Sequence, residues 1–172
     1  MKEFWDFDEN VNFSMVKGYK VLNIYPDTTS AAKLLNDLKF ITYRSFMSIH
    51  AIENVTPEIE LLLKTPFRLQ EMQLEKFQKV FFEGLNKPKG VRTKRTAQNL
   101  GKDGKLRATH RVIFLTIRHK NGKLKKIESI LPLLSHELTH TALNHVRWRD
   151  DDHRRPFNSL DKLILKHLKL NV

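Results

Sequence analysis

The sequence predicts an α+β fold in which several helices pack against a small β-sheet. Three apolar patterns predict it: helical spacing after residue 30 and again after residue 127, and strict alternation over 107–118. At 172 residues the chain is long enough to bury one hydrophobic core. We therefore expect a single domain that spans residues 1–172.

Four regions follow from these patterns along the chain. Residues 1–20 are expected to form an N-terminal arm, and residues 21–80 a mainly helical scaffold. Residues 81–126 are predicted as a basic region of loops with one strand. Residues 127–172 are predicted as two helices, the helix of the candidate active site and a closing helix.

The N-terminal half begins with a segment that mixes aromatic and acidic residues and is expected to be irregular through Ser14. Val21–Tyr25 is a short apolar run that ends at Pro26, which predicts an edge strand. A long amphipathic helix is predicted next, from possible N-cap residues at 27–30 to about His50. It is expected to support the helix of the candidate site.

A second helix is predicted to start at Thr56 and Pro57, with the threonine as N-cap and the proline at the first helical position. The following run, 67–82, is ambiguous, because its apolar residues fit either a helix or a turn that leads into a strand near 79–83. Residues 87–105 carry proline and glycine between basic residues, which predicts a long loop or an irregular hairpin.

Residues 107–118 predict a strand that is covered on both sides. Its residues alternate between two faces, one with Val112, Phe114 and Thr116 and the other with Ile113, Leu115 and Ile117. An Asn121-Gly122 pair then predicts a tight turn before the next helix.

The most informative motif is His136-Glu137-Leu138-Thr139-His140, an HExxH sequence. Residues four apart on a helix lie about 40° apart around its axis, so both imidazoles project from one face. That spacing lets two neutral imidazole nitrogens bind one zinc ion at about 2.0–2.1 Å. Glu137 lies beside the first ligand, where its carboxylate can take a proton from a zinc-bound water. The motif therefore predicts a zinc site with Glu137 as general base.

The helix that carries the motif is expected to begin between Ser129 and Leu131, because Pro132 is best tolerated in a first turn. Apolar residues on both sides of the motif are typical of a buried helix. The alternative interpretation is a core helix whose two histidines are satisfied by ordinary hydrogen bonds.

A zinc hydrolase usually needs a third protein ligand. His145 lies nine residues after His136, about 180° round a continuous helix, so it is expected to face away from the metal, as a surface residue or behind a ligand. His153 follows acidic residues 150–152, where the chain can fold back, and is predicted as the third ligand. His167 lies well along the last helix and is expected to be structural.

These motifs together resemble a known family. The sequence HELTH, followed after a gap by His153-x-x-x-Phe157 at the start of a closing helix, resembles the SprT/Spartan and WLM group of small zinc metallopeptidases. Residues 108–117, ATHRVIFLTI, resemble the strand that precedes the active-site helix in that group. The pattern is particularly similar to uncharacterised members from large DNA viruses. Members often have glycine after the third histidine, where this chain has Arg154.

The resemblance covers roughly residues 84–166 and implies a zincin-like (minigluzincin) fold, with the active-site helix packed on a long N-terminal helix and a small sheet. It implies Zn²⁺ as cofactor, held by His136, His140 and His153. It also implies that the strand at 107–118 flanks the cleft and can pair with an extended peptide. Proteins bound or crosslinked to DNA are the implied substrates.

The charge of the chain is unevenly distributed. Lysine and arginine exceed the acids by 12, and the excess comes from residues 87–126, in which Asp103 is the single acid. Such a block predicts contact with nucleic acid through phosphate, without sequence readout, and the alternative is a set of solvated loops. The candidate contacts are Lys87, Lys89, Arg92, Lys94, Arg95, Lys102 and Lys105.

The absence of cysteine excludes disulfides and thiolate metal ligands. No apolar run reaches the length of a membrane span, and the acidic, aromatic first ten residues are unlike a signal peptide. We therefore expect a soluble intracellular protein with no membrane partner. Its expected location is the cytoplasm or the nucleus, either of its own cell or of an infected host cell.

The leading interpretation is a zinc-dependent endopeptidase, in which Glu137 activates a zinc-bound water for attack on a peptide bond of a DNA-associated or DNA-crosslinked protein. One alternative is a nucleic-acid-binding module with a structural zinc site, which would need His145 or Asp152 as a fourth ligand. A second alternative is a processing peptidase that does not depend on DNA.

Overall fold

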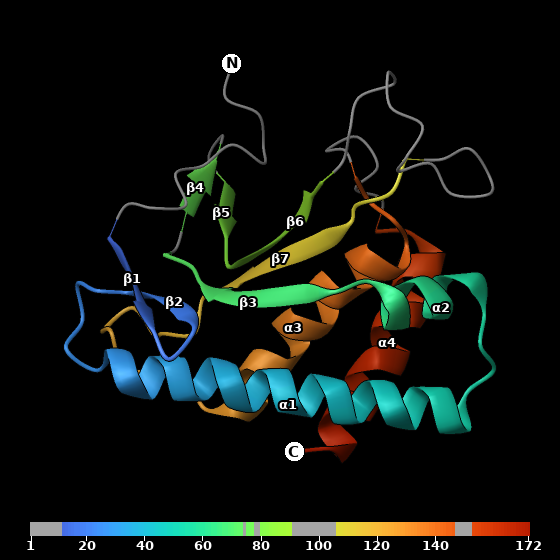
Figure 1. The fold of residues 1–172 in the computed structure, drawn as a ribbon, viewed down its shortest axis with the longest axis horizontal. Coiled ribbons are helices and arrows are strands. Elements are labelled where there is room, and N and C mark those ends of the chain that lie inside the picture. The colour runs from blue at the N-terminus through green and yellow to red at the C-terminus, as the bar shows by residue number, and fades with distance from the viewer. Residues whose placement is uncertain (1–11, 74, 78–79, 91–105, 147–152) are drawn as a thin grey trace.

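The computed structural model describes residues 12–73, 75–77, 80–90, 106–146 and 153–172. This part of the chain forms a mixed α+β structure with four helices and small sheets, as predicted (Figure 1). The helices are α1 (Thr28–Ile52), α2 (Pro57–Lys64), α3 (Ile127–Ala142) and α4 (Arg155–Leu170). The strands are β1 (Phe13–Val16), β2 (Tyr19–Leu22), β3 (Phe67–Glu71), β4 (Glu75–Phe77), β5 (Val80–Phe82), β6 (Gly84–Lys89) and β7 (His110–Leu115).

The main sheet has three strands in the order β3-β7-β6, so that β7 lies in the middle. Strand β7 runs parallel to β3 and antiparallel to β6. Strands β1 and β2 form a separate antiparallel pair, and so do β4 and β5. In Figure 1 the main sheet lies above α1, and α3 and α4 lie behind α1 as seen by the viewer.

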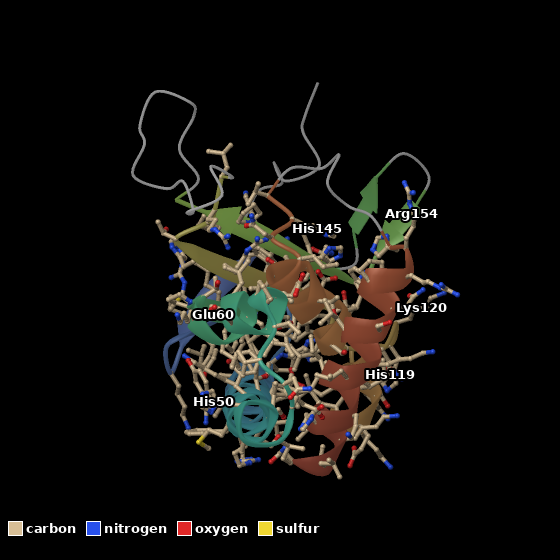
Figure 2. The ribbon with its side chains drawn as sticks, turned by 90° about the vertical axis from the view of Figure 1, so that its right-hand side faces the viewer. His50, Glu60, His119, Lys120, His145 and Arg154 are labelled. Atoms are coloured by element: carbon tan, nitrogen blue, oxygen red, sulfur yellow. The ribbon has the colours of Figure 1, made fainter. Side chains whose placement is uncertain are left out.

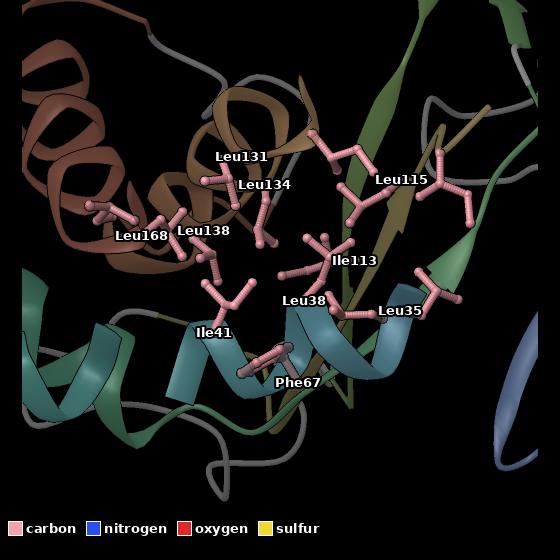
Figure 3. Close-up of a cluster of buried hydrophobic side chains, with 14 of the residues drawn as sticks. Leu35, Leu38, Ile41, Phe67, Ile113, Leu115, Leu131, Leu134, Leu138 and Leu168 are labelled. Carbon is pink, nitrogen blue, oxygen red and sulfur yellow. The ribbon is translucent and has the colours of Figure 1, made fainter. Parts of the chain in front are cut away.

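The alternation predicted for the middle strand is confirmed. Ile113 and Leu115 on one face of β7 belong to the large hydrophobic core, which takes residues from all four helices (Figure 3). Val112 and Phe114 on the opposite face belong to a second, smaller cluster with Met72 and Leu85. Because strand side chains point alternately to opposite faces, the helices therefore cover one face of this sheet.

The predicted N-terminal helices are also confirmed. In α1, apolar residues at helical spacing are buried in the core, among them Leu35, Leu38 and Ile41. At α2, the hydroxyl of Thr56 accepts a hydrogen bond from the backbone N–H of Ile59 and caps the helix, as expected from Thr-Pro.

The prediction of an arm over residues 1–20 is wrong for its second half, which forms the β1-β2 hairpin. Lys17 and Gly18 connect the strands with φ of +49° and +84°, the left-handed pair that a two-residue hairpin turn requires. The strand expected at Val21–Tyr25 is shifted accordingly and ends at Leu22. The remainder of the arm, residues 1–11, lies outside the described residues.

Residues 67–89 contain more strand than the sequence indicated. The ambiguous run at 67–82 contains β3, β4 and β5, whereas α1 and α2 make up the helical part of the predicted scaffold at 21–80. Residues 87–89 belong to β6, which pairs with β7 as an antiparallel hairpin. Residues 91–105, the rest of the predicted basic loop, lie outside the described residues.

Helix α3 begins at Ile127, earlier than the predicted start between Ser129 and Leu131, and Pro132 lies within it. Proline lacks the N–H that would bond the carbonyl of Glu128, four residues earlier. Both Pro132 and Glu128 are exposed, so solvent can satisfy that carbonyl and the helix tolerates the proline.

The resemblance implied that the strand at 107–118 can pair with an extended peptide. This expectation is wrong for β7, because β7 is the middle strand of the sheet. Both edges of β7 are occupied, and β6 is the last strand on its side of this sheet among the described residues. The N–H of Arg111 donates to the carbonyl of Pro66 on the β3 side, so its partner Pro88 in β6 turns its nitrogen to the outer edge. Proline is suited to that position because it has no donor to lose there.

Helix α4, the closing helix, starts at Arg155, next to the predicted start near Pro156. His167 is structural, as expected. The His167 side chain is fully buried, and its ring nitrogens lie 2.7 Å from Ser48 Oγ and 2.8 Å from Glu53 Oε1. These contacts attach α4 to the C-terminal end of α1. No helix among the described residues has the length and apolar character needed to span a bilayer.

A buried ion cluster connects the hairpin, α1 and the sheet. Nε of Arg118 lies 2.6 Å from Oε1 of Glu71, and its Nη1 lies 2.7 Å from Asp27. The second carboxylate oxygen of Glu71 accepts the N–H of Leu22. Burial raises the pKa of Glu71, against the hydrogen bonds from Leu22 and Arg118, so the charged carboxylate depends on these partners.

Arg118→Met is expected to lower the free energy of unfolding by about 3–5 kcal/mol, because it leaves the Glu71 charge buried without its partner. Urea unfolding measures this, with Lys33→Met as control. Lys33 makes an exposed pair with Asp37, whose loss costs about 0.5 kcal/mol. Equal losses in the two variants would contradict a stabilising role for the cluster.

Candidate metal centre

Helix α3 presents the two histidines of the HExxH motif on one face, as predicted. Nε2 of His136 and Nε2 of His140 lie 3.3 Å apart, and both side chains are partly exposed. The helix is held against α4, where the hydroxyl of Ser135 donates to the carbonyl of Asp161 at 2.8 Å. This contact brings the N-terminal end of α4 close to the two imidazoles.

His153 approaches the pair from the residues that precede α4. Its Nε2 lies 3.3 Å from Nε2 of His136, and its ring stacks on that of His136 with centroids 4.9 Å apart. The ligand atoms of His136, His140 and His153 all lie within 4.8 Å of one another. The structure thus brings together the three residues that the sequence predicted as ligands.

The three nitrogens fit a zinc ion by distance and by type. Two ligands of a tetrahedral zinc at about 2.0–2.1 Å are separated by about 3.3–3.4 Å, close to the 3.3 Å from Nε2 of His136 to Nε2 of His140 and to Nε2 of His153. Three neutral imidazoles are also a common ligand set for a zinc ion that keeps an open fourth position. His153 is exposed, so this position can be reached from solvent.

Phe157 forms the floor of the histidine cluster. Its ring centroid lies 4.8 Å from that of His136, 4.9 Å from that of His140 and 4.6 Å from that of His153. The phenylalanine is 2% exposed. Because it belongs to the first turn of α4, it fixes the approach of His153 to the cluster.

Glu137 belongs to α3, and its side chain points toward strand β6. Its side chain is 4% exposed, and its backbone carbonyl accepts a hydrogen bond of 2.5 Å from Nδ2 of Asn86. Strand β6 comes so close that a Cβ on Gly84 would lie 2.8 Å from Oε1 of Glu137 and 2.7 Å from Leu133. Glycine at position 84 is therefore needed for β6 to pass beside the carboxylate.

His145 does not take the place that a continuous helix would give it. Helix α3 ends at Ala142, and Asn144 adopts φ of +57°. The N–H of Asn144 then donates to the carbonyl of Thr141, and the N–H of His145 to that of His140, a Schellman motif. The chain is thereby reversed, and His145 is 7% exposed with Nδ1 at 2.8 Å from Nδ1 of His140.

The expectation of a surface position for His145 is wrong, because the residue is buried behind the ring of His140. Asparagine at 144 is the signal that could have predicted it, because asparagine is tolerated in the left-handed position that ends many helices. His145 lies at the same end of the molecule as Arg154, while His50 lies toward the opposite end (Figure 2).

The surroundings of the cluster keep His140 neutral. Burial lowers the pKa of His140 well below its ordinary value, and positive charge on His136, His145, His153 and Arg111 would lower it further. The neutral imidazole is the form that binds a metal.

The predicted phosphate contacts are only partly described. Lys87 and Lys89 lie in β6 on the same face as Leu85, opposite to the side that contacts α3. Arg68 in β3 occupies that face as well, and the register aligns it with Lys87 across Val112. Sequence reasoning missed Arg68 because it lies outside the basic block. The other candidates, Arg92, Lys94, Arg95, Lys102 and Lys105, lie outside the described residues.

Comparison with known proteins adds no relative. A scan of protein-family models, a search of curated proteins and a search of solved structures found no match to this chain. The resemblance to the SprT/Spartan and WLM metallopeptidases therefore stays a prediction that rests on the motif residues.

Metal-free protein is expected to lose stability as the pH falls below about 6.5, the ordinary pKa of histidine in an unfolded chain. His140 takes up a proton there when unfolded but not when folded, since its folded pKa is lowered. One such group lowers the free energy of unfolding by about 1.4 kcal/mol for each pH unit below that value. Urea unfolding at pH 7.5 and 5.5 in the presence of a chelator measures the loss. His140→Gln should show a smaller loss, and an equal loss would contradict the assignment.

Proposed function

We propose that the chain is a zinc-dependent endopeptidase. The observation that supports it best is the convergence of three Nε2 atoms, from His136, His140 and His153, next to a buried glutamate. A purely structural zinc site would use four protein ligands. His145 does not supply a fourth ligand, because its Nδ1 lies against Nδ1 of His140, and Asp152, the other candidate, lies outside the described residues. A general base beside the ligands, the role proposed for Glu137, is needed for hydrolysis and not for a structural site.

His136, His140 and His153 would hold the zinc, which, when bound, supplies a Lewis acid that activates water and polarises a carbonyl. Glu137 would accept a proton from the attacking water as the water oxygen bonds to the carbonyl carbon of the peptide. The same carboxyl would then give that proton to the amine nitrogen as the C–N bond breaks. The anchor from Asn86 to the Glu137 carbonyl keeps this part of α3 in place.

The substrate class is an extended polypeptide. Strand β6 has an outer edge without a strand partner among the described residues, and Gly84 at its start lies against the Glu137 carboxylate. A peptide that adds to this edge would bond the outward backbone groups and run past Glu137. Strand β6 thus takes the role that the sequence assigned to residues 107–118.

Proteins bound or crosslinked to DNA are the substrates that the family resemblance favours. The structure offers an independent, weaker argument. One face of the main sheet carries Arg68, Lys87 and Lys89 and is called here the basic face. Arg68 and Lys89 are close enough to His110 for their charges to lower its pKa, after the larger effect of burial. Clustered cations of this kind attract phosphate without reading sequence. They lie on the face opposite α3, so DNA held there would leave the metal centre open.

Glu137→Gln is expected to bind zinc like the wild type and to lower the rate of peptide cleavage by roughly 10²–10⁴-fold, because the general base is lost. His140→Ala should lose both zinc and cleavage. The measurement is cleavage of a DNA-binding protein by the zinc-loaded enzyme, with and without single-stranded DNA, alongside zinc stoichiometry.

The outcomes separate the candidate functions. Cleavage that requires DNA and is lost in Glu137→Gln supports the full proposal. Cleavage that is indifferent to DNA indicates a processing peptidase instead. Normal cleavage by Glu137→Gln would disprove the mechanism. Stoichiometric zinc without any cleavage would favour a binding module with a structural metal.

Arg68→Gln and Lys89→Gln are each expected to weaken DNA binding and to reduce the slope of log K against log salt by about 0.7–0.9, one phosphate contact each. Titration of a fluorescent oligonucleotide at several salt concentrations measures the slope. Lys169→Gln removes an exposed charge of α4 and serves as control. If all three variants change the slope equally, the basic face is not the binding surface.

A further inference from the structure

The back of the metal centre contains a contact between two histidine rings that the proposed chemistry does not use. His140 directs Nε2 toward the other ligands and Nδ1 toward Nδ1 of His145, at 2.8 Å. We propose that His145 is a positioning residue, which accepts the Nδ1–H of His140 and so holds that ring in the tautomer that binds zinc. The inference rests on the proposed zinc site.

The tautomers follow from hydrogen-bond chemistry. Two ring nitrogens at 2.8 Å form a hydrogen bond when one of them carries a proton and the other offers a lone pair. A lone pair on Nε2 of His140 is needed for the metal, so the ring proton must lie on its Nδ1. Nδ1 of His145 is then the acceptor, and His145 carries its own proton on Nε2. Metal-binding histidines generally donate their second nitrogen to such a partner, usually a carboxylate or a carbonyl.

The structure fixes His145 in this place from two directions. The Schellman motif after α3 reverses the chain, and Nη1 of Arg111 donates to the carbonyl of His145 at 2.7 Å. Arg111 itself is 1% exposed and also donates to Oδ1 of Asn86 at 3.3 Å. Among the described residues no carboxylate forms an ion pair with this guanidinium, and its Nε has no hydrogen-bond partner there. A buried cation held by neutral oxygens costs free energy, which argues for a positional role.

The same network reaches the general base. Asn86 accepts from Arg111 and donates to the Glu137 carbonyl and, at 2.7 Å, to the hydroxyl of Thr141. One buried amide therefore ties the strand that carries Gly84 to the turn of α3 that carries Glu137. Through Arg111 it is also tied to the residue that orients His140.

Two substitutions at position 145 separate orientation from packing. The rings of His145 and Phe157 stack with centroids 6.4 Å apart. His145→Phe keeps an aromatic ring in this stack but removes the nitrogen that accepts from His140. His145→Asn loses the ring but offers Oδ1 near the place of Nδ1. We expect His145→Phe to weaken zinc binding by about 10–100-fold and His145→Asn to stay within a few-fold of wild type. A role in packing alone predicts the opposite order.

The measurement is a competition titration of the full chain with zinc and a chromophoric chelator. Nitrogen-15 spectra of the histidine side chains in the metal-free wild type give a second readout that does not depend on the stability of a variant. A proton on Nδ1 of His140 and none on Nδ1 of His145 supports the inference. A proton on Nε2 of His140 overturns it.

The two proposals fail in different ways. A wild type that binds no zinc would disprove the metal site and, with it, the inference. A wild type that binds zinc, with both variants binding equally well, would overturn the role of His145 and leave the zinc site intact.

Discussion

The candidate site depends on the hydrogen bonds that fasten α3 to the sheet through the side chain of Asn86. This amide is 2% exposed and bonds a backbone carbonyl, a hydroxyl and a guanidinium on two other elements. A buried amide is costly unless its donors and acceptor are satisfied, so the strand and the helix can pack in few other ways. The polar anchor adds directional hydrogen bonds to the hydrophobic packing and helps to set the position of α3 relative to β6. The position of Glu137 against β6 is a consequence.

Zinc would connect two elements that are distant in the chain. His136 and His140 belong to α3, whereas His153 lies just before α4, and residues 147–152 of the connection lie outside the described residues. A metal held by all three would crosslink the helices at the end where Phe157 already packs between them. Free energy of metal binding would thus add to the free energy of folding, as in other sites whose ligands come together only in the native state.

The strongest periodic patterns predicted their elements correctly, and so did the local Thr56-Pro57 signal at the start of α2, whereas other local signals were missed. Strand β7 and helices α1 and α4 follow from apolar spacing over several turns or residues, and the HExxH spacing identified two histidines of the cluster. The β1-β2 hairpin was missed because Lys17-Gly18 is a weaker turn signal than Asn-Gly. The role of His145 was missed because one left-handed residue, Asn144, redirects the chain. Whether a helix continues or reverses at such a residue depends on tertiary contacts, here with Arg111.

The outward nitrogen of Pro88 has a consequence for the behaviour of the protein at high concentration. An exposed strand edge is a template on which other copies can pair, and long pairing of this kind leads to aggregation. At Pro88 the outer edge of β6 lacks a donor, so a ladder that starts beside Gly84 is interrupted within a few residues. If β6 takes up an extended segment at this edge, Pro88 would keep the pairing short and would oppose the continuous sheet growth that joins one molecule to the next.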